Sequence, residues 1–296
     1  MTRLTAKDFD QDLLDLYDFY AHGKISKREF LDRAGKWAVG GLTAGAILAT
    51  LTPNYALAQQ VAEDDPDIAG EEITYESPNG TGTVNAYLVR PAASENPPGA
   101  VLVVHENRGL NPYIRDVTRR LAKAGFIAMA PDGLSSVGGY PGNDDEGREL
   151  QSQVDGELLM NDFFAGFEHL AALEGTNGKV GATGFCYGGG VVNAIAVAYP
   201  ELSAGVPFYG RQAAAADVPR IEAPLLLHYA ALDSRINAGW TEMQRALEEN
   251  DKIYEAVIWP DVNHGFHNDT TPRYDAEAAE AAWDRTVAWF RVYLAA

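Results

Sequence analysis

The chain predicts an α/β fold, built on a mostly parallel central sheet with helices on both faces. Short apolar runs typical of buried strands alternate along the chain with longer segments of helical character. This alternation is typical of a parallel sheet that is covered on both sides. The 296 residues, 46% of them hydrophobic, suffice for one large domain of this kind.

The first two expected strands form an antiparallel hairpin. Residues 73–77 and 84–90 have strand character and flank the turn-forming sequence Asn79-Gly80-Thr81-Gly82. Further strands are expected at 100–104, 126–130, 180–183, 204–208, 224–229 and 253–259. Helices are expected at 113–124, 147–173, 191–199, 237–249 and 276–293.

The single cysteine is the strongest indication of chemistry. Cys186 lies in the run Gly184-Phe185-Cys186-Tyr187-Gly188, directly after an expected strand. A nucleophile with small residues two positions away on each side is typical of a sharp strand-to-helix turn, because glycine lets the backbone bend tightly. The thiol would lie at a helix N-terminus, where the helix dipole favours the thiolate. A buried structural cysteine is the alternative, and the bracketing glycines favour the nucleophile.

An acid and a histidine that could serve this thiol follow it in the chain. Asp233 comes after the expected strand 224–229, and His264 comes after the strand-like run 254–259. All three residues fall at the carboxyl ends of expected strands, where open α/β sheets gather their sites. Their order of nucleophile, acid and histidine is that of α/β-hydrolases. The sequence therefore predicts a catalytic triad of Cys186, Asp233 and His264.

The triad and the segment His105-Glu106-Asn107-Arg108-Gly109-Leu110 resemble the dienelactone hydrolase family (carboxymethylenebutenolidases), over about residues 70–296. The resemblance implies an α/β-hydrolase fold and hydrolysis of esters or lactones through a thioester on Cys186. It also implies that Glu106 lies beside the thiol and holds it until substrate displaces it. A loop carboxylate in water is the alternative for Glu106. Backbone N–H groups of Asn107 and Tyr187 would form the oxyanion hole, since acyl transfer needs two donors aimed at the developing charge.

The substrate is less clearly indicated. The resemblance implies arginines that hold a substrate carboxylate, and the sequence offers no convincing match for the first of them. Arg108, Arg211 and Arg273 are candidates for substrate contacts, and each is equally compatible with an ordinary solvated arginine. The turn-rich loop 133–142, which includes Tyr140, is expected to shape the mouth of the site. A broad-specificity carboxylesterase is therefore the close alternative to a dienelactone hydrolase.

Charge and motifs restrict the partners. The net charge of −19 argues against nucleic acid, whose phosphates would be repelled. The chain has no glycine-rich phosphate loop, dinucleotide fingerprint or zinc-ligand spacing, so no cofactor and no metal are predicted. The pair His264 and His267, three positions apart, is the alternative that would indicate a metal site. His105 and His228 are expected to be structural. The expected partner is a small ester or lactone substrate.

The first 58 residues are treated as a region separate from the hydrolase domain expected over 59–296. Ser26-Lys27-Arg28-Glu29-Phe30-Leu31 resembles a twin-arginine export signal with Lys27 in place of the first arginine, and residues 56–58 match a cleavage signal. The apolar stretch 37–51 is too short for a typical membrane span. Export to the periplasm or the exterior, with cleavage after Ala58, is predicted. The amphipathic pattern at 8–20 supports the alternative of a retained, docked segment in a cytoplasmic protein.

Two other classes of function remain as alternatives. Cys186 could be a redox-active thiol, although the sequence has no second cysteine to resolve an oxidised form. The chain could also be a non-catalytic binding module, which an intact triad disfavours. The sequence does not indicate the oligomeric state.

Overall fold

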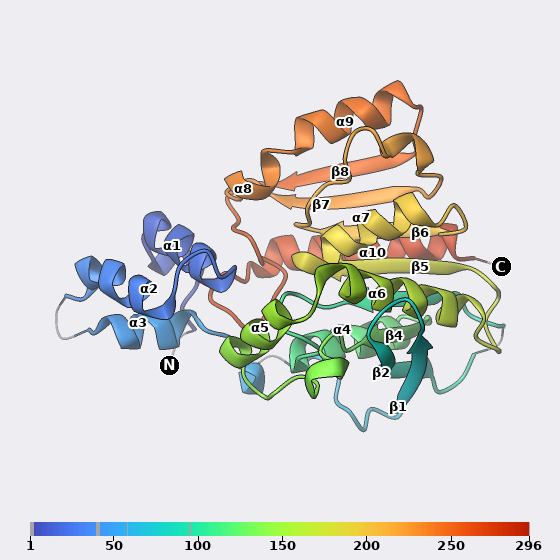
Figure 1. The fold of residues 1–296 in the computed structure, drawn as a ribbon, viewed down its shortest axis with the longest axis horizontal. Coiled ribbons are helices and arrows are strands. Elements are labelled where there is room, and N and C mark those ends of the chain that lie inside the picture. Colours follow the sequence, from blue (N-terminus) through green and yellow to red (C-terminus); the bar gives the residue numbers. More distant parts are fainter. Residues whose placement is uncertain (1–2, 40–41, 58, 95, 296) are drawn as a thin grey trace.

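The computed structural model describes residues 3–39, 42–57, 59–94 and 96–295, and its chain path is drawn in Figure 1. A lobe of short N-terminal helices lies to one side of a larger body that is built around a single sheet (Figure 1). The lobe consists of α1 (Gln11–Ala21), α2 (Lys27–Ala34), α3 (Ala44–Leu51) and 3₁₀ turns at Ala6–Asp8, Gly35–Trp37 and Tyr55–Leu57.

The sheet has eight strands in the order β1-β2-β4-β3-β5-β6-β7-β8. The β1–β2 and β2–β4 pairs are antiparallel, and the remaining pairs are parallel. The prediction of a mostly parallel sheet with an N-terminal hairpin is therefore confirmed. The strands are β1 (Ile68–Ser77), β2 (Gly82–Pro91), β3 (Ala100–Val104), β4 (Ile127–Pro131), β5 (Val180–Phe185), β6 (Ala204–Phe208), β7 (Leu225–Ala230) and β8 (Tyr254–Trp259).

Helices cover both faces of this sheet, because the side chains of its strands alternate between two apolar layers. Leu102 of β3 belongs to the layer formed with α6, α7 and α9, whereas Val101 and Val103 belong to the layer formed with α4 and α10. The helices that follow the lobe are α4 (Pro112–Lys123), α5 (Asp144–Gln153), α6 (Gly156–Ala171), α7 (Tyr187–Ala198), α8 (Ser234–Asn237), α9 (Trp240–Glu249) and α10 (Ala276–Tyr293).

The prediction of one long helix over 147–173 is wrong, because two helices share that region. The chain leaves the helical conformation at Val154, and Asp155 begins α6 as its N-cap. The Asp155 carboxylate accepts hydrogen bonds from the backbone N–H groups of Glu157 and Leu158. An Asp-Gly pair inside a helical pattern is a start signal for a new helix.

The N-terminal lobe has its own small apolar core, formed by one face of α1 together with α2 and α3. The amphipathic helix expected at 8–20 is α1. Polar contacts join the lobe to the larger body, among them Tyr20 to Asp145 at 2.5 Å and Gln11 to Asn263 at 2.6 Å. No helix among the described residues has the length and apolarity that crossing a bilayer requires. Ala58, the predicted cleavage position, lies outside the described residues.

Candidate active site

Cys186 lies on the sharp turn between β5 and α7. Its backbone has φ 56° and ψ −112°, a conformation that costs energy for any residue with a side chain. The neighbouring glycines are required by close backbone approach. A Cβ on Gly184 would lie 2.4 Å from the Gly188 carbonyl oxygen, and one on Gly188 would lie 2.2 Å from that of Val104. The thiol thus lies at the N-terminus of α7, as its bracketing glycines predict.

Asp233 and His264 come together at the ends of β7 and β8. His264 Nδ1 donates to Asp233 Oδ2 over 2.5 Å, and both side chains are buried. Burial would raise the pKa of Asp233, but the charge and the hydrogen bond of His264 outweigh it and hold that pKa below its ordinary value. The bond fixes the imidazole with its other nitrogen, Nε2, as the acceptor. Among the described residues this buried Nε2 has no hydrogen-bond partner.

Cys186 and His264 belong to one compact cluster. The sulfur of Cys186 and one ring nitrogen each of His264 and His22 all lie within 4.8 Å of one another. Since Nδ1 of His264 is held by Asp233, its Nε2 is the nitrogen left for the thiol. The structure therefore places the three predicted triad residues side by side at the carboxyl edge of the sheet.

Of the two predicted oxyanion donors, Tyr187 follows the thiol directly in the chain, and Asn107 belongs to a distant segment. Tyr187 is the first residue of α7, and Asn107 is in the loop after β3. Within the described part of the chain, neither backbone N–H has a protein acceptor. The Asn107 side chain donates to the Ala21 carbonyl of α1 over 2.9 Å, so this loop also contacts the lobe.

Glu106 is buried, and its carboxylate is bonded to an asparagine. Its Oε2 accepts from Asn268 Nδ2 over 3.1 Å, and no hydrogen bond to Cys186 is present among the described residues. With 3% of its surface exposed, it is not a loop carboxylate in water. Its role as the holder of the thiol remains a prediction.

A second histidine, which the sequence analysis missed, reaches the thiol from the N-terminal lobe. His22 Nε2 lies 3.1 Å from the Cys186 sulfur, and His22 Nδ1 lies 3.2 Å from a carboxylate oxygen of Asp18. Its ring meets that of His264 edge-on, with 4.8 Å between centroids. Burial would lower the pKa of His22, but the Cys186 charge and the Asp18 contacts outweigh it and raise that pKa. The available sequence signal was the Asp18–His22 spacing of four, which puts both on one helix face.

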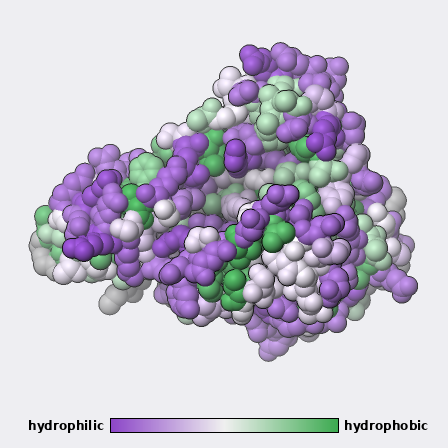
Figure 2. All heavy atoms as spheres, viewed as in Figure 1, coloured by the Kyte–Doolittle hydropathy of each residue, from purple (hydrophilic) through white to green (hydrophobic). Residues whose placement is uncertain are grey.

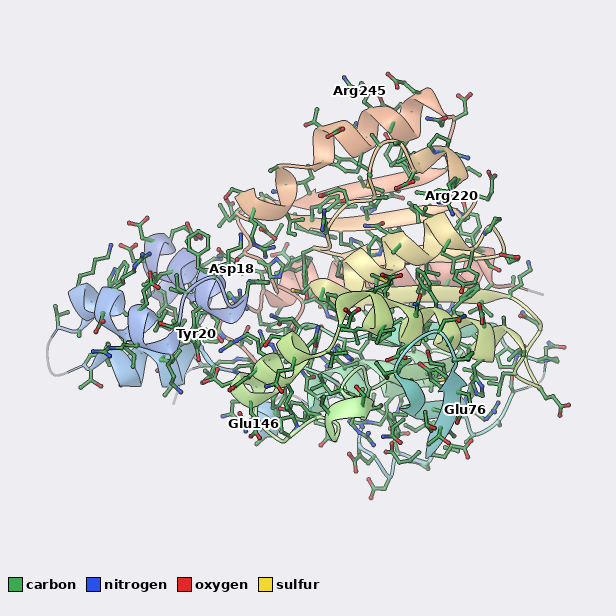
Figure 3. The ribbon with its side chains drawn as sticks, viewed as in Figure 1. Asp18, Tyr20, Glu76, Glu146, Arg220 and Arg245 are labelled. Carbon is green, nitrogen blue, oxygen red and sulfur yellow. The ribbon has the colours of Figure 1, made fainter. Side chains whose placement is uncertain are left out.

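Asp18 also binds two arginines that line the site. Its carboxylate pairs with Arg235 Nε at 3.2 Å and with Arg273 at 3.3 Å. Arg235 in turn lies 3.1 Å from His22 Nε2 and 3.4 Å from His264 Nδ1. In Figure 3, Asp18 lies on the side of α1 that faces the larger body. A carboxylate of the lobe thus neutralises the basic wall beside the triad.

The interpretation of Arg108 and Arg273 as ordinary solvated arginines is wrong, because both are buried. Arg108 pairs with Asp144 at 2.8 Å, and Asp144 also accepts from the Tyr140 hydroxyl over 3.1 Å. The two candidate substrate contacts Arg108 and Tyr140 are therefore joined through the Asp144 carboxylate that both of them bind. Arg211 is exposed and lines a groove of about 580 Å³ over α7, away from the His264 pair.

Three further histidines have structural partners, and His267 is not among the described residues grouped with His264. His267 Nδ1 bonds to the Tyr113 hydroxyl over 2.7 Å in the core. His105 Nε2 accepts from the Gly133 N–H over 3.0 Å. His228 accepts from the Trp259 indole over 3.2 Å, as expected for a core histidine.

The cavity beside Asp233 and His264 is small, and Cys186 is not among the residues that line it. A cavity of about 90 Å³ lies between α1 and the loops that carry Asp233 and His264. Sites for small molecules usually measure several hundred cubic ångströms. The residues that line it are Leu14, Asp15, Asp18, Phe19, Leu232, Asp233, Ser234, Arg235, Asn263, His264 and Arg273. Helix α1 therefore occupies much of the approach to the thiol.

Comparisons with known proteins match both parts of the chain. A family model described as "Dienelactone hydrolase family" matches residues 84–294, and one described as "YqhI-like" matches residues 1–38. "Putative hydrolase fragment YghX" of Escherichia coli K12 is 68% identical over 114 residues, which is 38% of this chain and 97% of that protein. A "Putative carboxymethylenebutenolidase" of Methylorubrum extorquens AM1 is 32% identical over 278 residues, covering 85% of this chain and 94% of the relative.

Solved structures agree with this assignment. The "Putative Dienelactone Hydrolase" from Klebsiella pneumoniae superposes with a TM-score of 0.67 at 29% identity, covering 76% of this chain and 99% of the other. The "Dienelactone Hydrolase-like Promiscuous Phospotriesterase P91" has a TM-score of 0.65 at 22% identity over 77% of this chain and 99% of that one, and supports the fold alone. Taken with the α/β-hydrolase sheet and the matched residues 84–294, these similarities establish that the chain belongs to the dienelactone hydrolase family of carboxylic ester and lactone hydrolases.

Proposed function

We propose that this hydrolase opens its ester or lactone substrates through a thioester formed on Cys186. The observation that supports the proposal is the position of the thiol. It lies on a strained turn at the N-terminus of α7, in one cluster with His264, whose Nδ1 is held by the buried carboxylate of Asp233. A base whose orientation is fixed by a third group is the arrangement that nucleophilic catalysis requires.

The first half of the reaction transfers the acyl group to sulfur. Cys186 loses its proton to an imidazole, and the thiolate attacks the carbonyl carbon, forming a C–S bond while the carbonyl electrons move to oxygen. The N–H groups of Asn107 and Tyr187 stabilise that oxyanion. When the tetrahedral intermediate collapses, the C–O bond breaks and the leaving alkoxide takes a proton from His264.

The second half regenerates the enzyme. His264 removes a proton from water, whose oxygen attacks the thioester carbonyl, and the C–S bond breaks to release the acid and the thiolate. Asp233 stabilises the imidazolium in both halves. Activated esters and strained lactones suit this site better than amides, because their leaving groups depart more easily.

The arginines beside the triad favour substrates with a carboxylate. Arg235 and Arg273 converge on the Asp18 carboxylate, next to His264. A substrate carboxylate could take the place of Asp18 once α1 moves aside, and the cavity of about 90 Å³ makes that movement necessary for substrate binding. A broad carboxylesterase is the second candidate, because neither arginine is free in this arrangement.

The test is a comparison of substrates with the full chain. Hydrolysis of a dienelactone and of a panel of p-nitrophenyl esters is measured beside the variant Cys186→Ala, with intact mass recorded during turnover. We expect turnover that the variant lacks, and an acyl adduct on the wild-type chain alone. Faster turnover of the dienelactone supports the carboxylate-binding proposal, and indifference to the carboxylate supports the broad esterase.

Absence of turnover on every ester and lactone would overturn the hydrolytic proposal for Cys186. Peroxide consumption would then favour the redox-active thiol, and ligand binding without turnover would favour a binding module.

The cellular location is a separate proposal. We propose that residues 1–58 are retained, because Asp18 and His22 contribute to the site and Lys27 of the export-like motif pairs with Asp145 at 3.0 Å. Export with cleavage after Ala58 is the opposing prediction. Mass spectrometry of the protein recovered from periplasmic and cytoplasmic fractions decides between them: an N-terminus at residue 59 in the periplasm would contradict retention.

A further inference from the structure

We propose that His22, Cys186 and His264 form a binding site for a divalent cation of the zinc type. The three side chains come from the C-cap of α1, the turn after β5 and the loop after β8, so the site joins the N-terminal lobe to the hydrolase domain. Thiolate and imidazole are the ligands that zinc prefers in proteins. The proposal can be tested independently of the proposed hydrolysis, since cation binding can be measured without substrate.

The distances suit a tetrahedral ion. Around zinc, sulfur and nitrogen ligands lie about 3.6 Å apart and two nitrogens about 3.4 Å apart, from bond lengths of about 2.3 and 2.1 Å. Here His22 Nε2 lies 3.1 Å from the sulfur, and all three ligand atoms lie within 4.8 Å of one another. Small side-chain movements therefore bring all three to one ion, and a water molecule completes the tetrahedron.

Each imidazole is already oriented as a metal ligand. Asp18 holds Nδ1 of His22 and Asp233 holds Nδ1 of His264, which leaves Nε2 of each ring as the nitrogen available to an ion. Carboxylate–histidine–metal arrangements of this kind fix the tautomer and increase the affinity of the ligand. Two such pairs beside one thiol are more than the triad alone requires.

The unpartnered nitrogen of His264 is the independent observation. Its Nε2 is buried without a hydrogen-bond partner among the described residues, and a buried polar atom without a partner is costly. A bound cation would satisfy it. His22 Nε2 also lies 3.1 Å from Arg235, so that guanidinium must turn away and keep its contact with Asp18.

Charge also permits a cation here. Binding releases the thiol proton, so a thiolate and the two carboxylates of Asp18 and Asp233 surround the ion. The opposing positive charges are the guanidinium groups of Arg235, which lies against both imidazoles, and of Arg273, which pairs with Asp18. The consequence is regulatory. The ion binds the nucleophilic sulfur and links α1 to the domain over the site, so it inhibits hydrolysis reversibly.

The experiment uses the full chain, reduced and freed of metal by a chelator that is then removed. Co²⁺ is added first, because thiolate coordination to this ion gives a charge-transfer absorption band. Zn²⁺ is then titrated against a chromophoric chelator to obtain the stoichiometry and affinity. We expect one equivalent of each ion, with a thiolate band that Zn²⁺ removes.

Variants identify the ligands. We expect Cys186→Ala to abolish the Co²⁺ band, His22→Ala to weaken Zn²⁺ binding by about 100-fold or more, and Asp18→Asn to weaken it by about 10- to 100-fold. His169→Ala is the matched control, a half-buried histidine on α6 outside the cluster. Thermal unfolding of each variant verifies that it folds.

Two results would overturn the proposal. One is no stoichiometric binding at micromolar Zn²⁺ in the wild type. The other is an unchanged Zn²⁺ affinity in His22→Ala. If hydrolysis also falls in that variant, His22 is a positioning residue for the thiol. Hydrolysis by the metal-free wild type is measured in parallel, so failure of the cation site is distinguished from failure of the hydrolytic mechanism.

Discussion

The N-terminal lobe and the hydrolase domain each bring an Asp–His pair to the same thiol, yet they are stabilised differently. The domain is held by two continuous apolar layers on a sheet, and its pair, Asp233–His264, is fixed by strand ends. The lobe has a separate small core and meets the domain mainly through ion pairs and hydrogen bonds. Its visible surface is largely hydrophilic in Figure 2.

This difference indicates that the hydrolase domain is the rigid part of the molecule and that the lobe is the part able to move. Apolar layers resist small displacements, because packed interiors leave few voids. Ion pairs between side chains, such as those of Asp18 with Arg235 and Arg273, can be replaced by pairs with a competing carboxylate or with water. The pair from the domain is therefore suited to catalysis, which needs fixed geometry, and the pair from the lobe is suited to control of access.

The largest expected effect tests the fixed pair. Replacing Asp233 by Asn leaves His264 in the wrong tautomer, so kcat for ester hydrolysis should fall by about 10³- to 10⁴-fold. The matched control is Asp261→Asn, an exposed carboxylate on the loop before His264 whose φ of 56° asparagine tolerates. A loss of less than tenfold in Asp233→Asn would remove the distinction between the two pairs.

A second change tests the rigidity of the turn that carries the thiol. Gly188→Ala would place a Cβ 2.2 Å from the Val104 carbonyl, and backbone of a central strand cannot move aside cheaply. We expect the free energy of unfolding in urea to fall by about 3 kcal/mol. Gly156→Ala, with open space around its Cβ, serves as control and should be neutral. Equal stability of the two variants would mean that the turn is adaptable.

Acid should weaken the domain through its buried histidines. Burial lowers the pKa of His228 to about 3, so the folded state leaves it neutral where the unfolded chain binds a proton. Stability that is complete above about pH 6.5 is therefore lost as pH falls toward 3, at about 1.4 kcal/mol per pH unit for this group. Urea titrations at several pH values measure the slope, and His228→Asn should flatten it. An unchanged slope would exclude His228 as its source.

The smallest effect concerns the docking of the lobe. Tyr20→Phe removes the 2.5 Å bond to Asp145 and should weaken docking by about 1 kcal/mol, measured as faster limited proteolysis of residues 1–60. Tyr293→Phe is the matched control on α10. Figure 3 shows Tyr20 at the side of the lobe that borders the domain.

Acid should have a related effect at this contact. Burial would raise the pKa of Asp145, but its bonds to Tyr20 and Lys27 outweigh it and lower that pKa. The contribution of ionised Asp145 to docking of the lobe is therefore present above about pH 4 and is lost as pH falls further. Proteolysis at a rate independent of pH between 5 and 3 would contradict this assignment.

The sheet and the triad positions could be predicted from sequence because their signals are local. Apolar runs mark strands, and parallel strands place their carboxyl ends at one edge, which brings together Cys186, Asp233 and His264. His22 could not be found in this way. Its partner lies 164 residues away, and its segment matches the pattern of an export signal. The helix break at Asp155 was available locally and was missed, since helical composition on both sides obscured it.

The contact between the first and last parts of the chain has a consequence for biosynthesis. Residues 11–51 have a core of their own and can collapse as soon as they leave the ribosome, because their contacts are local. The surface on which they dock does not yet exist at that point, since Asn263 and Arg273 are synthesised more than two hundred residues later. Helices α1 to α3 are therefore synthesised before the surface on which they dock. The lobe can therefore dock only after the loop that carries His264 and Arg273 has been made.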